Sequence, residues 1–158
     1  MRRRLDAPAA FIARLFLGGV FAYAGYAKLM EPAENFQFFL RGYGVLPEAV
    51  IAPISYGLPW LEWIFGMFLI AGYAPRLSAV SLGIFSVCFA AVILMSGKLA
   101  GGEAESCGCF GEGGLKLDVR HIFVVDLINI FLGFRLFLLQ EFPWSLDSVL
   151  KKAPANKV

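Results

Sequence analysis

The sequence predicts an all-α integral membrane protein, a bundle of four spanning helices, and composition is the first reason. Hydrophobic residues make up 59% of the 158 residues, whereas charged residues make up 16%. A soluble domain usually carries about a quarter charged residues. The apolar residues also form long blocks, and the mean hydropathy is +0.71. A net charge of +2 without a basic stripe gives no indication of nucleic-acid binding.

The second reason is the length of the apolar blocks. A helix needs roughly 20 mostly apolar residues to cross the hydrocarbon core. The blocks show no alternation with a period of two, so helices rather than barrel strands are expected. We expect one domain that runs up, down, up and down through spans at about residues 9–30, 54–73, 77–96 and 119–139.

Each span has its own signals. The first follows Pro8 and is long enough to be retained as a span rather than cleaved as a signal peptide. The second starts near two prolines, which are typical of a helix N-terminus or a kink. The third carries no charge, and it follows a tight turn around Pro75. Between the first two spans, the aromatic segment 31–41 predicts a short interfacial helix that ends at the Gly42-Tyr43-Gly44 turn.

The positions of Lys and Arg predict the orientation. Basic residues precede the first span, occupy the turn between spans two and three at Arg76, and end the chain at Lys151, Lys152 and Lys157. Because cytoplasmic loops carry an excess of Lys and Arg, we expect both termini in the cytoplasm. The two longer loops, 31–53 and 97–118, then face the outside of a bacterial inner membrane.

The second outer loop contains Cys107-Gly108-Cys109 in a glycine-rich setting. On that side of the membrane disulfides form and persist. Two cysteines one residue apart can pair only where the chain bends, which Gly108 permits, and strained exposed disulfides tend to be labile or catalytic. The motif therefore predicts a redox-active dithiol. A static disulfide, half of a zinc site completed by His121, and two idle thiols are the alternatives.

Other polar residues fall within the spans. Glu62 lies near the middle of the second span, and Asp126 lies about a third of the way into the fourth. Charged groups in lipid normally face the bundle interior with a partner, and we expect Lys28 or Arg120 to pair with Asp126. These side chains are candidates for a structural ion pair or a proton relay. Cys88, in the third span, is expected to be a small buried hydrophobe.

Four motifs along the spans and the second outer loop belong together: Arg14-Leu15-Phe16-Leu17-Gly18, Gly25-Tyr26-Ala27-Lys28-Leu29, Pro59-Trp60-Leu61-Glu62 with Gly66 and Gly72, and Ser106-Cys107-Gly108-Cys109-Phe110-Gly111. In these motifs the chain resembles the DoxX-like superfamily and, within it, the MauE (methylamine utilisation) branch. The last motif is the most specific.

The resemblance implies a role in maturing periplasmic proteins by disulfide formation, together with a thioredoxin-like partner. It also implies Cys107 and Cys109 as the redox pair, Lys28 and Glu62 as family positions, and a quinone as a candidate electron acceptor. The leading hypothesis is a membrane thiol–disulfide oxidoreductase or electron conduit. The alternatives are a non-catalytic subunit of a larger, quinone-linked membrane complex and a small-solute or proton transporter.

Overall fold

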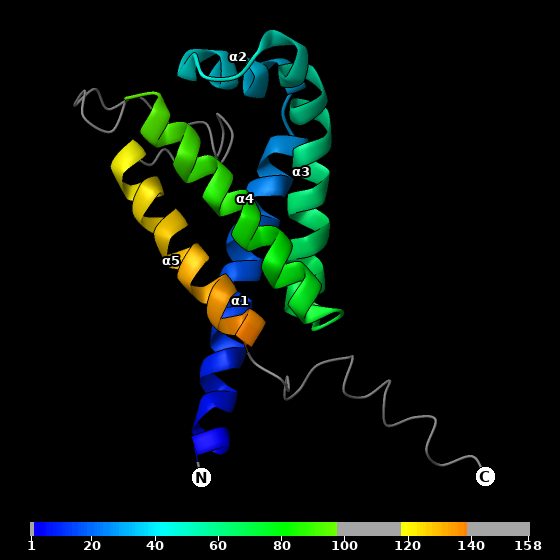
Figure 1. Cartoon of the computed structure of the whole chain (residues 1–158). Coiled ribbons are helices and arrows are strands. Elements are labelled where there is room, and N and C mark those ends of the chain that lie inside the picture. The colour runs from blue at the N-terminus through cyan, green and yellow to red at the C-terminus, as the bar shows by residue number, and fades with distance from the viewer. Residues whose placement is uncertain (1, 98–117, 139–158) are drawn as a thin grey trace.

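A computed structural model of the chain describes residues 2–97 and 118–138. Five helices occupy this part of the chain, and it contains no strand. They are α1 (Arg2–Leu29), α2 (Ala33–Tyr43), α3 (Glu48–Ala71), α4 (Pro75–Met95) and α5 (Val119–Leu138) (Figure 1). All except α2 are long and apolar enough to cross a membrane, α1 from Pro8 onward. The predicted all-α bundle is confirmed.

The four long helices run up, down, up and down, and α2 lies across one end of the bundle (Figure 1). That end also holds the last turn of α1, the first turns of α3 and α5, and the end of α4; we call it the α2 end. The helix predicted for 31–41 is confirmed as α2. It ends at Gly44, whose φ of 67° places it in the left-handed region that glycine tolerates.

The turn between α3 and α4 is short, as expected. Gly72 has a φ of 74°, and its N–H and that of Tyr73 donate to carbonyls in the last turn of α3. This arrangement satisfies orphan carbonyls at the helix end. Pro75 then begins α4, where its missing N–H costs nothing. At its other end α3 begins at Glu48, six residues before the predicted start at 54, because Pro53 lies within the helix.

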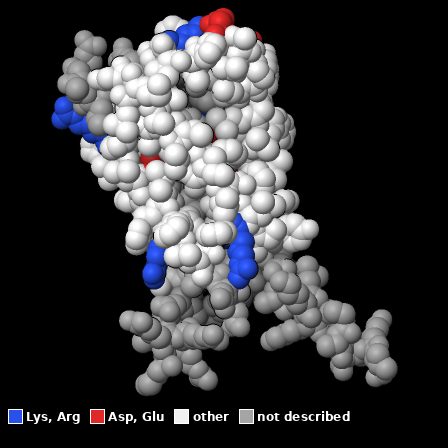
Figure 2. Space-filling view, viewed as in Figure 1, with Lys and Arg blue, Asp and Glu red and all other residues white. Residues whose placement is uncertain are grey.

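The buried residues of each spanning helix recur with a spacing of seven residues. In α3, the face consists of Ser55, Pro59, Glu62, Gly66 and Leu69, among others. The faces of α1 and α5 follow the same spacing, and they include Lys28 and Asp126. The large residues on the outside are mostly apolar, and the middle of the visible face is almost all uncharged (Figure 2). Polar groups inside and apolar groups outside fit a protein surrounded by lipid.

Glycines bring α1 and α3 close together. A Cβ atom added at Gly25 would lie 2.6 Å from the Pro59 carbonyl oxygen and 2.6 Å from the Trp63 nitrogen. One added at Gly66 would lie 2.6 Å from the Ala22 nitrogen. Small residues at such contacts allow helix backbones in membranes to approach closely. The α1–α3 contact positions the charged residues described next.

Candidate functional site

An ion pair between α1 and α3 lies inside the bundle. Lys28 Nζ donates hydrogen bonds to both carboxylate oxygens of Glu62, at 2.7 Å to Oε2 and 3.0 Å to Oε1. Each side chain is 1% exposed. Lys28 is in the last turn of α1, where the helix dipole favours a positive charge. Glu62 occupies the middle of the buried face of α3, so the seven-residue spacing of both helices brings the two groups together.

Two aromatic rings also contact the Lys28 ammonium. The nitrogen lies 5.0 Å from the centre of the Phe36 ring, on α2, and 5.1 Å from that of Phe89, on α4. A cation within about 6 Å of a ring face is attracted by the ring quadrupole, and more strongly where water is excluded. The charge of Lys28 is therefore stabilised by groups from three helices.

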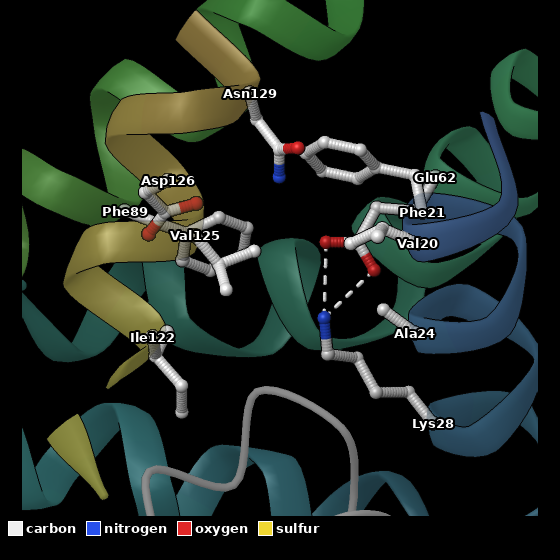
Figure 3. Close-up of a pocket in the computed structure, with 10 residues that line it drawn as sticks. All are labelled: Val20, Phe21, Ala24, Lys28, Glu62, Phe89, Ile122, Val125, Asp126 and Asn129. Carbon is white, nitrogen blue, oxygen red and sulfur yellow. Dashed lines mark hydrogen bonds and ion pairs between the residues drawn. The ribbon is translucent and has the colours of Figure 1, made fainter. Parts of the chain in front are cut away.

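Across from this pair, α5 presents Asp126 and Asn129 (Figure 3). They are three residues apart, so they lie on one face of the helix. Both are buried, with Asn129 1% exposed. The two residues and the Lys28–Glu62 pair line a space of about 30 Å³ between the helices, which we call the polar chamber. Its remaining walls are apolar: Val20, Phe21, Ala24, Phe89, Ile122 and Val125.

The polar chamber adds a contact that was not expected. Lys28 and Arg120 were the expected candidate partners for Asp126, and the Lys28 ammonium donates to both oxygens of Glu62. The reason is that α1 packs closely on α3 and contacts it more extensively than it contacts α5. Lys28, Glu62 and Asp126 nevertheless line one site, although they come from three different spans.

A second buried cation lies fourteen residues before Lys28 on the same face of α1. The Arg14 side chain donates from Nε to the Leu69 carbonyl and from Nη2 to the Ile70 carbonyl, both at 3.2 Å. These carbonyls belong to the last turn of α3, which ends at Ala71. Arg14 thus caps the C-terminus of α3, where basic side chains both satisfy carbonyls and complement the dipole.

An apolar groove of about 540 Å³ lies between α2, α3 and α4. Phe89 lines both this groove and the polar chamber, and Phe36, the other ring beside Lys28, lines the groove as well. Cys88 also lines the groove and is exposed. The expectation that Cys88 is buried is therefore wrong. It sits on the outward side of α4, where an apolar side chain meets lipid.

Cys107 and Cys109, the predicted redox pair, lie outside the described residues. Within residues 2–97 and 118–138, no three His, Cys, Asp or Glu side chains come close enough together to hold a metal ion. His121, offered above as a zinc ligand, is exposed near the start of α5.

The model of the family described as methylamine utilisation protein MauE matches residues 6–139 of the chain. The chain belongs to the MauE family. One relative is the methylamine utilization protein MauE of Methylophilus methylotrophus, 32% identical over 111 residues, which is 66% of this chain. The aligned part spans 54% of that relative, about half its length. No solved structure matches the chain.

In this member of the MauE family, the family match includes all three helices that supply charges to the polar chamber. Sequence reasoning identified Lys28, Glu62 and Asp126 but did not single out Asn129 or Phe89. The spacing of Asn129, three residues after Asp126 in an apolar span, is a usable signal for the former. Phe89 is one of 16 phenylalanines, and nothing in the sequence distinguishes it.

Proposed function

We propose that this protein is a membrane thiol–disulfide oxidoreductase that helps to mature a protein outside the cytoplasmic membrane, in the context of methylamine utilisation. In this proposal the membrane is the bacterial inner membrane, with both termini in the cytoplasm. The observation that carries the proposal is Cys107-Gly108-Cys109 in the segment that joins α4 to α5. The MauE family name supports the metabolic context.

The position of this segment in the chain supports the link between the cysteines and the bundle. It leaves α4 and enters α5 at the α2 end. Ile122, in the first turn of α5, lines the polar chamber together with Lys28 and Glu62. The segment that contains the cysteines is thus tethered to the end of the bundle that holds Lys28.

The proposed reaction is disulfide transfer to a client dithiol. One client thiolate attacks a sulfur of the Cys107–Cys109 disulfide, whose S–S bond breaks as a mixed disulfide forms and the other cysteine leaves as a thiolate. The second client thiolate then attacks the client sulfur of the mixed disulfide. The client is oxidised to a disulfide, and the cysteine pair takes up two electrons as a dithiol. A thioredoxin-like protein is the proposed carrier between this pair and the client.

The dithiol must then lose two electrons and two protons to an acceptor. A lipid-soluble quinone would supply this chemistry, since it takes up both. The apolar groove fits the chain and ring of such a molecule in size and lining, and Phe36, Leu58, Leu61, Phe85 and Phe89 would hold it. Phe89 lies between the groove and the polar chamber, so Lys28 and Glu62 would hold protons close to the ring of a quinone bound in the groove.

Thiol trapping in intact cells tests the proposal. A membrane-impermeant maleimide is applied with and without prior reduction, in a Cys88→Ala background that removes the third cysteine. We expect Cys107 and Cys109 to react only after reduction, and a Cys109→Ser variant to trap a partner in a mixed disulfide. Free labelling without reduction, and no trapped partner from either single variant, would overturn the redox proposal.

The apolar groove favours a second candidate, a non-catalytic subunit of a larger membrane complex. An apolar helix of another subunit would fill the same space between α2, α3 and α4. This candidate predicts that the Cys107→Ser/Cys109→Ser double variant keeps full function in cells, whereas bulky polar substitutions in the groove abolish co-purification with other subunits.

A further inference from the structure

The side-chain oxygen of Asn129 is a buried acceptor without a donor among the described residues. The residue is 1% exposed. Buried polar atoms are nearly always hydrogen-bonded, either to protein or to ordered water. The Asn129 side chain faces the polar chamber (Figure 3). An acceptor that lacks a protein donor and faces a polar space requires a donor in that space.

The polar chamber has the size and chemistry for water. Its volume is about 30 Å³, and a water molecule needs roughly 10–15 Å³ measured in this way, together with two to four polar partners. Its lining offers an ammonium, two carboxyl groups and an amide.

Charged groups reach the polar chamber from three helices: Lys28 from α1, Glu62 from α3 and Asp126 from α5. The fourth helix, α4, contributes only the Phe89 ring. A water among these groups would donate to Asn129 and to one carboxylate, and it would accept a hydrogen bond from the other acid in its protonated form or from a second water. Such a chain would connect carboxyl groups on two different helices through hydrogen bonds along which a proton passes.

We propose that the polar chamber holds about one or two water molecules that form a proton relay between Glu62 and Asp126, with Asn129 positioning the water. Intramembrane carboxyl groups that face a polar space are typical of such relays. The inference rests on the polar chamber alone and not on the activity proposed for Cys107 and Cys109. If both hold, the relay serves the protons that dithiol oxidation releases.

Infrared difference spectroscopy of the full-length protein in liposomes tests the relay. In the wild-type protein, we expect an O–H band of bound water that shifts when H₂¹⁸O replaces water. Asn129→Leu, close in size but without the amide, should remove this band. Ser55→Ala is the matched control, because Ser55 is buried on α3, its hydroxyl already donates to the Ala52 carbonyl, and it does not line the polar chamber; it should leave the band unchanged.

Titration of the carboxyl C=O bands tests the connection between the two acids. Asp126→Asn should move the titration midpoint of the remaining carboxyl by about one pH unit or more, as expected for coupled sites. Asn129→Leu should reduce this coupling while preserving the helical content by circular dichroism. Absence of the water band in the wild-type protein, or carboxyl groups that titrate independently of each other, would overturn the proposal.

Discussion

The two buried cations of α1 illustrate two ways to place a positive charge in a membrane. Arg14 and Lys28 lie on the same face of the helix and both bond to α3. Arg14 donates to backbone carbonyls at the end of α3, whereas Lys28 donates to the Glu62 carboxylate. Carbonyls do not titrate, so the Arg14 contact has one state. The Lys28–Glu62 contact has a partner that can gain a proton, and only this contact adjoins a polar chamber.

The largest effect is expected at the ion pair. Glu62→Leu leaves the Lys28 ammonium buried with no carboxylate, and loss of one partner of a buried pair costs about 3–5 kcal/mol. The double variant Lys28→Met/Glu62→Leu should recover most of this loss, because no charge is then left buried. Unfolding in detergent with increasing SDS measures the stability of the single and the double variant. A single variant as stable as the wild type would contradict the importance of the pair.

The exposed pair formed by Arg41 and Glu48 provides the control for that experiment. Arg41 Nε donates to Glu48 Oε1 at 2.7 Å, but both side chains are largely in contact with solvent. Arg41→Gln should leave the unfolding midpoint unchanged, since exposed pairs contribute little.

The next effect concerns the contact that positions both cations. Gly25→Val would place side-chain atoms against the α3 backbone near Pro59, and such overpacking costs about 1–3 kcal/mol or more. Because Gly25 lies one turn from Lys28 and three from Arg14, the Glu62 contact should suffer first. Gly19→Ala is the matched control, since a Cβ there meets nothing within 4 Å. If both variants lowered the SDS unfolding midpoint equally, the result would argue against a close α1–α3 approach.

Arg14→Gln tests the other cation. It removes hydrogen bonds from a charged donor, which are worth about 1.5–3 kcal/mol each, but the Gln amide can still donate to one of the two carbonyls, so we expect the loss of about one such bond. We expect lower stability at every pH tested and no change in the carboxyl titration of the polar chamber. A change in that titration would contradict this expectation, because it would show that the Arg14 contact is coupled to the polar chamber.

The smallest effect is expected at Phe89. Phe89→Leu keeps an apolar side chain but loses the ring beside Lys28, a contact worth about 0.5–2 kcal/mol. Phe137→Leu, on the exposed side of α5, is the control. The difference between the two SDS unfolding midpoints reports the contribution of the ring beside Lys28. A difference of zero would show that the Phe89 ring does not stabilise the Lys28 charge.

Much of this fold follows from the sequence because an apolar chain in a membrane can satisfy its backbone hydrogen bonds in few ways. The four spans, α2 and the short α3–α4 turn were all predictable from run length, aromatic content and the glycine and proline positions. The early start of α3 was not, because Pro53 reads as a boundary in a sequence although a membrane helix tolerates it.

The site was predictable in its residues but not in its pairing. Lys28, Glu62 and Asp126 stand out because charges are rare in spans, yet charge alone does not say which helices touch. The close α1–α3 approach, which depends on Gly25 and Gly66, decides that Lys28 meets Glu62. Cys88 was misjudged for a related reason: in a uniformly apolar helix such as α4, the sequence does not reveal which face meets lipid.

The Lys28–Glu62 pair also bears on how the chain enters the membrane. Each of these charges alone makes its span harder to insert, by about 2.5–3.5 kcal/mol for a charge near the centre of a helix, as Glu62 is, and by less for Lys28 in the last turn of α1. Since α1 and α3 are consecutive spans joined only through α2, both emerge from the ribosome before α4 does. Their contact neutralises the two charges together, so α1 and α3 would leave the translocon as a joined hairpin, onto which α4 and α5 pack afterwards.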